Sequence, residues 1–171
     1  MTTSDISTMP AIQATRKAYK ALGKDPARYR PASEALIRRV VKGKGLYQIN
    51  NVVDLLNLVS IRSGYSICGY DTSFIQGTVE LGIGEENEPY DGIGRGKLNI
   101  QYLPTFRDEM GAFGTPTSDS TRTMIRSTTT NFLMIFLDFE GLSLLQASLD
   151  EAVDLLVKYG EEENIEIKII S

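Results

Sequence analysis

The chain has 171 residues and a mass of 18.9 kDa, which fits one domain spanning residues 1–171. Its formal net charge is -4 and 42% of its residues are hydrophobic, a composition typical of globular proteins and not of disordered or membrane-spanning ones. The sequence has one cysteine and no histidine, which excludes an intramolecular disulfide, histidine-dependent catalysis and the common zinc sites. The polar N-terminus does not read as a secretory signal. We expect a cytoplasmic protein that uses no metal or cofactor.

The first third of the sequence predicts helices. Apolar residues recur at helical spacing in three segments, and a glycine follows each segment as a stop. Asn51 is the expected N-cap of the third helix, with Asp54 near the positive end of the helix dipole. Residues 1–8 are expected to be disordered. The expected helices span residues 9–22, 32–42 and 51–63.

Beyond Gly64 the sequence pattern changes to that of strands. Apolar residues alternate with other side chains over several short segments. The long apolar run 130–139 predicts a buried central strand. The expected strands are 78–83, 98–102, 104–107, 111–114, 130–139 and 165–169, and the expected late helix is 143–159. The fold class is therefore α+β, with N-terminal helices followed by a mixed, mainly antiparallel β-sheet, a late amphipathic helix and a C-terminal strand.

Charge is distributed unevenly along the chain. The segment from Arg16 to Lys44 has ten basic and two acidic residues, a net charge of +8, whereas the segment from Asp150 to Ser171 has seven acids and two lysines. Such asymmetry indicates a polyanionic partner, or alternatively a solvated helix face balanced by an acidic tail. If the partner is RNA, the expected phosphate-binding residues are Arg28, Arg30, Arg38, Arg39, Lys42 and Lys44.

Three separated motifs carry a resemblance to a known family. They are the stretch Gly45–Gly64, which contains Ile-Asn-Asn-Val-Val-Asp and leads to Gly69-Tyr-Asp, the segment Arg30–Arg39, and the segment Phe106–Thr123. The first of these resembles the tRNA-binding and editing module of the bacterial phenylalanyl-tRNA synthetase beta subunit. With Arg30–Arg39 upstream and Phe106–Thr123 downstream of it, the chain more closely resembles the free-standing, one-domain members of that family. The resemblance implies the α+β fold of that module. It also implies an RNA-associated protein that binds tRNA or aminoacyl-tRNA.

The resemblance implies an editing activity, from which the sequence departs at two places. In the synthetase the module hydrolyses tyrosine wrongly attached to the phenylalanine tRNA, with a His just before the aromatic-Asp pair and a Glu after a Leu-Asp-Gly turn. Here the first place is Ile67-Cys68-Gly69-Tyr70-Asp71, without His, and the second is Tyr90-Asp91-Gly92-Ile93-Gly94, without Glu. We therefore expect tyrosine on the phenylalanine tRNA to be a poor substrate. Cys68 beside the His position is either a nucleophile or a buried inert thiol.

The segment Phe106–Thr123 is the main candidate site. Its glycines allow close approach of a ligand to the backbone, and its carboxylates and hydroxyls can position a water or a carbonyl group. Alternatively it forms a tight turn held by side-chain hydrogen bonds. The candidate catalytic residues are Asp108, Ser118, Asp119 and Thr123. The candidate substrate-binding residues are Tyr70, Asp71, Phe106, Gly111, Gly114, Ser120 and Arg122.

Three functions remain open at this point. The first is tRNA or aminoacyl-tRNA binding with hydrolysis of a mischarged ester in trans, which would make the protein an aminoacyl-tRNA deacylase and not a full synthetase. The second is non-catalytic binding of an amino acid or a small amino-acid derivative. The third is an interaction module with a vestigial pocket. The sequence leaves the recognised amino acid, the tRNA and the oligomeric state open.

Overall fold

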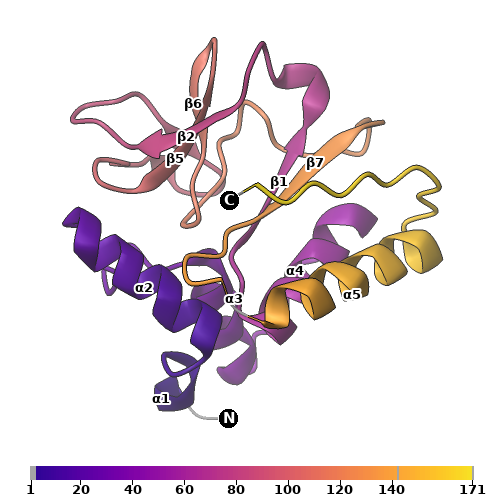
Figure 1. Cartoon of the computed structure of the whole chain (residues 1–171), viewed down its shortest axis with the longest axis horizontal. Helices are drawn as coiled ribbons and strands as arrows, with labels where there is room; N and C mark the ends of the chain where they lie inside the picture. Colours follow the sequence, from indigo (N-terminus) through magenta and orange to yellow (C-terminus); the bar gives the residue numbers. More distant parts are fainter. Residues whose placement is uncertain (1–2, 142, 171) are drawn as a thin grey trace.

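The computed structural model describes residues 3–141 and 143–170. In Figure 1 the helices occupy one half of the molecule and most of the strands the other half. The helices are α1 (Thr3–Ile6), α2 (Pro10–Leu22), α3 (Ala32–Val41), α4 (Asn51–Ser63) and α5 (Leu144–Tyr159), with a short 3-10 turn at Thr72–Phe74. The helices predicted at 9–22, 32–42, 51–63 and 143–159 are thus confirmed to within one or two residues.

Local capping sets the helix ends. Gly23 and Gly64 follow α2 and α4 in the left-handed conformation, at φ 92° and 82°, as expected of C-terminal glycines. The N-cap of α4 differs from the prediction, because Asn50 and not Asn51 accepts the 3.0 Å hydrogen bond from the Val53 N–H. The Asn51 side chain instead donates to the Tyr159 carbonyl and so joins the start of α4 to the end of α5.

All strand pairs in the described residues are antiparallel, which agrees with the expected α+β class. They form three small sheets: β1 with β7, β2 with β5 and β6, and β3 with β4. The strands are β1 (Ile67–Asp71), β2 (Glu80–Ile83), β3 (Asp91–Gly92), β4 (Gly96–Lys97), β5 (Pro104–Asp108), β6 (Gly111–Gly114) and β7 (Phe132–Phe136).

Several sequence expectations are corrected. The run 130–139 is not a central strand, since β7 pairs only with β1 among the described residues and is half-buried along its length. Residues 98–102 form no strand in the described structure: 98–100 have no regular secondary structure, and 101–102 form a turn in which Tyr102 has a positive φ of 66°. Residues 165–169 form no strand in the described structure. Residues 3–6 of the expected disordered terminus form α1, which is anchored by the fully buried Ile6.

Two apolar clusters position the candidate site. One lies between α4, β1 and α5 and contains Leu56, Val59, Tyr65, Ile67 and Ala152. The other joins β1 to the β5–β6 hairpin and contains Cys68, Tyr70, Phe106, Phe113 and Leu137. This second cluster brings the Gly69-Tyr-Asp motif against the Phe106–Thr123 motif, although about forty residues separate them in the chain.

Candidate functional site

A hydroxyl-capped turn presents Asp119. The Thr115 hydroxyl accepts from the N–H groups of Thr117 and Ser118 at 3.3 and 3.1 Å and donates to the Ser118 carbonyl at 3.0 Å. This is a local turn of the kind that threonine side chains stabilise. The Pro116 carbonyl accepts from the N–H of Ala32 at 2.8 Å, which fixes the turn to the start of α3.

The carboxyl group of Asp119 is buried against β1. Its Oδ2 accepts from the Gly69 N–H at 3.2 Å, while its buried Oδ1 has no hydrogen-bond partner among the described residues. Burial raises the pKa of Asp119 to about 7, although the Gly69 N–H and the nearby Tyr70 and Cys68 side chains act in the opposite direction. A carboxyl group with a pKa near 7 can exchange a proton at neutral pH.

The Tyr70 ring fills the space between β1 and the β5–β6 hairpin. It meets Phe106 and Phe113 edge-on, with ring centroids 6.3 and 4.8 Å away. Its hydroxyl lies against Gly114, where a Cβ atom would overlap it. Among the described residues neither this hydroxyl nor that of Thr123 has a hydrogen-bond partner, although both residues are fully buried. Because buried polar groups usually have partners, these hydroxyls and Asp119 Oδ1 are suited to hold a polar ligand or water.

The Cys68 thiol is part of the same buried cluster. Its Sγ donates to the Thr115 carbonyl at 3.7 Å. Burial, followed by the charge of Asp119, raises the pKa of Cys68 well above its ordinary value. Since the thiolate is the nucleophilic form, this environment favours the inert thiol over the nucleophile.

Asp108 and Arg122 bind each other. The Arg122 guanidinium donates to both carboxylate oxygens, at 2.8 and 3.1 Å, and to the carbonyls of Phe74 and Gly111. Asp108 also accepts from the N–H groups of Gln76 and Met110. Burial alone would raise the pKa of Asp108, but these hydrogen bonds, led by Arg122, lower it. The pair joins β5, β6 and the following loop.

The other candidate residues lie around this frame. Asp71 accepts from the Ser73 and Thr129 side chains, and its pKa is lowered first by these two hydrogen bonds. The Ser120 hydroxyl accepts from the Arg122 N–H at 3.2 Å. The Ser118 hydroxyl donates to the Asp119 carbonyl at 3.4 Å. Gly111 is partly exposed at φ 112°. The structure therefore brings Tyr70, Gly114 and Asp119 together, and gives Asp71 and Asp108 partners outside that group.

Sequence reasoning missed Tyr90. This buried tyrosine follows Pro89 in what reads as a turn, and its hydroxyl donates to the Ser118 carbonyl at 2.6 Å. Burial and the charge of Asp119 raise its pKa. A lone tyrosine between turn residues has no periodicity that would place it in a core, so the sequence offered no pattern for finding it.

Replacing Tyr70 by phenylalanine is expected to leave the free energy of unfolding unchanged or to raise it, because the lost hydroxyl forms no hydrogen bond within the described part of the chain. Tyr19→Phe is the matched control: Tyr19 is also fully buried, but its hydroxyl lies 2.9 Å from Thr117 Oγ1. Losing that hydrogen bond should cost about 1 kcal/mol. Chemical denaturation of both variants tests the difference. If both variants lose the same unfolding free energy, the Tyr70 hydroxyl forms a hydrogen bond in solution, and the prediction is wrong.

The basic segment does not form one continuous free surface. Glu34, fully buried, pairs with Arg16 and Arg38 at 2.8 and 2.9 Å. Lys17 pairs with Glu140 at 2.6 Å. The ammonium group of the buried Lys24 donates to the carbonyls of Asn99 and Gln101; burial, then the charge of Arg28, lowers its pKa. Four of the ten basic residues are thus committed to internal contacts.

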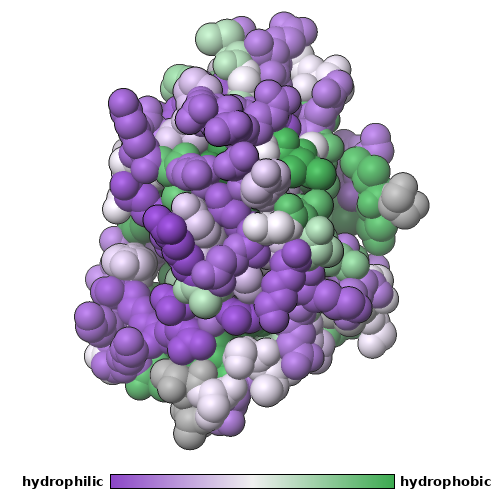
Figure 2. Space-filling model, turned by 90° about the vertical axis from the view of Figure 1, so that its left-hand side faces the viewer, coloured by the Kyte–Doolittle hydropathy of each residue, from purple (hydrophilic) through white to green (hydrophobic). Residues whose placement is uncertain are grey.

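The remaining candidate RNA-binding residues fall at the two ends of α3. Arg28 and Arg30 are exposed just before this helix, and Lys42 and Lys44 are exposed just after it, about 15 Å further along a ten-residue helix. Arg39 lies near the second end, with its guanidinium 4.0 Å from the centre of the Tyr47 ring. Figure 2 shows that the face on the left of Figure 1, where α2 runs, is mainly hydrophilic with smaller hydrophobic patches.

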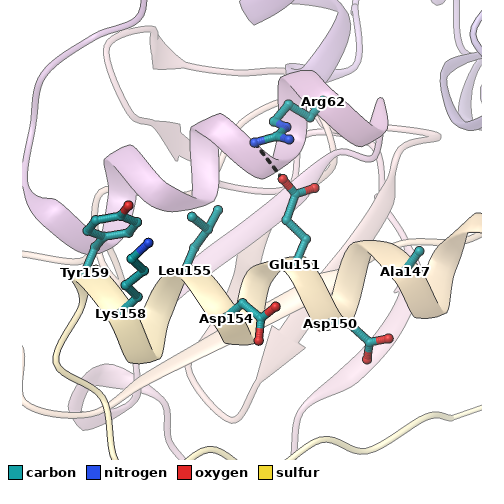
Figure 3. Close-up of a pocket in the computed structure, with 8 residues that line it drawn as sticks. All are labelled: Arg62, Ala147, Asp150, Glu151, Asp154, Leu155, Lys158 and Tyr159. Atoms are coloured by element: carbon teal, nitrogen blue, oxygen red, sulfur yellow. Dashed lines mark ion pairs between the residues drawn. The ribbon is translucent and has the colours of Figure 1, made fainter.

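Two surface hollows lie away from the Asp119 cluster. One, of about 760 Å³, runs between α4 and α5, where Arg62 and Glu151 reach toward each other and form a 2.9 Å ion pair (Figure 3). The other, of about 590 Å³, lies on α2 and includes Arg16, Lys17 and Lys20. Neither is lined by a residue predicted to be catalytic or substrate-binding.

The helices, the antiparallel sheets and the turn that presents Asp119 form an α+β module. The family model of the B3/4 domain matches residues 14–160, from within α2 to the residue after α5. The chain therefore belongs to the B3/4 domain family, that of the phenylalanyl-tRNA synthetase beta subunit. This membership indicates a tRNA-synthetase-related nucleic-acid-binding module. A search of curated proteins finds no match. No helix within the described residues has the length and hydropathy to cross a membrane.

Proposed function

We propose that this protein binds tRNA or aminoacyl-tRNA. The observation that carries the proposal is its membership of the B3/4 domain family. Exposed cations at both ends of α3 support it, because phosphate groups are held mainly by such side chains. Arg28 and Arg30 adjoin the turn that presents Asp119, since the Thr117 hydroxyl donates to the Tyr29 carbonyl at 3.4 Å. A bound acceptor end would therefore lie near that turn.

We also propose that Asp119 serves as general base for hydrolysis of a mischarged aminoacyl ester. In this step Asp119 takes a proton from water as the water oxygen bonds to the ester carbonyl carbon. The tetrahedral intermediate then expels the ribose oxygen of the tRNA, which receives the proton. Ser118 and Thr123 are the hydroxyls proposed to orient the water. No histidine is required, because a carboxylate with a pKa of about 7 is suited to this transfer.

A second candidate function is non-catalytic binding of an amino acid or a small amino-acid derivative. The observation that favours it is the burial of the Asp119 carboxyl group beside the fully buried Tyr70, which suits a small ligand better than an open active site. In this role Asp119 would pair with the ligand ammonium group. The third possibility, an interaction module with a vestigial pocket, predicts neither binding nor turnover.

A panel of tRNAs charged with different amino acids separates these functions. We expect tRNA binding that weakens steeply as the salt concentration rises, and slow deacylation of tyrosine on the phenylalanine tRNA. For any ester that the protein hydrolyses, Asp119→Asn should lower the rate by about 100-fold. The control is Asp91→Asn, which changes an exposed aspartate in the neighbouring hairpin.

Other outcomes of the same experiment are informative. If no ester is hydrolysed but calorimetry detects binding of an amino acid that Asp119→Asn abolishes, the non-catalytic function holds. If the protein binds neither tRNA nor an amino acid at low salt, the proposal fails.

A further inference from the structure

The loop between α3 and α4 has the composition of a nucleic-acid contact. Between Glu34 and Asp54 the chain carries four basic residues and no acid. Lys42 and Lys44 are exposed, and neither forms an ion pair within the described part of the chain. Phosphate groups could therefore approach this loop without displacing an existing partner.

The same loop exposes an aromatic ring. Tyr47 is 52% exposed and Ile49 is 58% exposed. The Arg39 guanidinium lies over the Tyr47 ring at 4.0 Å from its centre, and its Nε is buried without a hydrogen-bond partner among the described residues. Arg39 thus supports one side of the ring and leaves roughly half of the residue's surface open.

The loop backbone is also accessible. Gly43 and Gly45 adopt positive φ angles of 73° and 65°, and no atom lies within 4 Å of where their Cβ atoms would be. Gly43 bends the chain between the two lysines and Gly45 bends it just after the second, and both leave room for close approach of a ligand to the backbone.

We propose that this loop binds an unpaired segment of RNA, with Tyr47 stacking on a base and Lys42, Lys44 and Arg39 contacting the flanking phosphates. The inference rests on the proposed RNA binding and adds which loop contacts the RNA and how it does so. Exposed aromatic rings among cations bind single strands, because a base in a duplex already has its faces covered. The Arg39–Tyr47 contact holds the ring in place before RNA arrives, which reduces the conformational cost of binding.

The end of α5 provides a matched contrast. Tyr159 is 51% exposed, and Lys158 lies 5.0 Å from the centre of its ring. Three glutamates, Glu161 to Glu163, follow it after Gly160. Their charge disfavours phosphate, so Tyr159 should not contact RNA despite its similar exposure and its own cation.

The inference is tested by measuring RNA affinity with fluorescence anisotropy. One probe is a labelled single-stranded RNA of about ten nucleotides, and the other is the same sequence as a blunt duplex. At about 50 mM salt, Tyr47→Leu should weaken single-strand binding by about tenfold or more, whereas Tyr47→Phe and Tyr159→Leu should bind like the unmodified protein. Tyr47→Leu should leave duplex binding unchanged. Lys42→Gln with Lys44→Gln should lower the slope of log affinity against log salt by about 1.4.

The outcomes separate this inference from the proposed function. If Tyr47→Leu binds the single strand like the unmodified protein while the lysine variant weakens it, the stacking mode is overturned and RNA binding stands. If Tyr159→Leu weakens binding as much as Tyr47→Leu, the assignment to this loop is overturned. If the unmodified protein binds neither RNA, the proposed function and the inference both fail. Thermal unfolding of each variant verifies that the half-exposed substitutions leave the fold intact.

Discussion

Alanine in place of Gly114 is expected to lower the free energy of unfolding by about 3 kcal/mol or more, among the largest effects of any single methyl group in this protein. The new Cβ would overlap the Tyr70 hydroxyl and lie 2.5 Å from the ring carbon that bears it. The ring cannot retreat, because Phe106 and Phe113 pack against it. Chemical denaturation measures the loss.

The control for Gly114→Ala is Gly94→Ala. Gly94 has a positive φ of 67° and open space where its Cβ would be, so alanine there should cost only about 1 kcal/mol of backbone strain. A double-mutant cycle adds a sharper criterion. In a Tyr70→Ala background the clash is gone, so Gly114→Ala should cost far less there than in the unmodified protein. Additive losses would contradict a direct contact between the two positions.

The stability of the protein is expected to fall between about pH 4 and pH 7 because of Asp119. Burial raises the folded-state pKa of this group from 3.8 to about 7. Over this range the folded chain keeps a proton that the unfolded chain has released, so each pH unit of increase disfavours the folded state by about 1.4 kcal/mol. The contribution is fully present below about pH 4, and about 4 kcal/mol of it is lost by the time the pH passes 7.

Comparison with Asp119→Asn isolates this contribution. The lowered pKa values of Asp71 and Asp108 act in the opposite sense, since their stabilisation is present at neutral pH and is lost as the pH falls through their folded-state pKa values. Both effects remain in the variant and cancel in the difference. The difference in unfolding free energy should therefore change with pH between about 4 and 7. Parallel curves over that interval would mean that Asp119 ionises in the fold as easily as in water.

The sequence predicts the helices of this protein well because their determinants are local. Gly23 and Gly64 stop α2 and α4, and the helical spacing of apolar residues places α5. The pairing of β1 with β7 joins residues about sixty positions apart, and nothing near either strand indicates its partner. The apolar run that contains β7 therefore reads as a central strand, although it is half-buried in a two-stranded sheet.

The sequence indicates which segments contain the candidate site, but not which of its side chains are buried or bound to each other. The motif resemblance brings Tyr70 and Asp119 into one region, and in the structure the Asp119 carboxyl group accepts from the N–H of Gly69, the residue before Tyr70 in β1. Arg122, which holds Asp108, lies in the loop after β6, and the sequence does not show that this loop brings it back to the end of β5. Lys24 lies in a basic run that reads as surface, yet two carbonyls from a distant loop bury its ammonium group.

The C-terminal tail has a consequence for how copies of this protein meet in solution. Ile167, Ile169 and Ile170 are 48%, 64% and 82% exposed, and in Figure 1 this segment passes in front of β1 and β7 without becoming a strand. An alternating isoleucine segment without a ladder is a template for the same segment of another molecule. Four glutamates in the same tail, Glu161, Glu162, Glu163 and Glu166, oppose such pairing between molecules by repelling each other. Association of two copies through this segment is therefore opposed by the charges that flank its isoleucines.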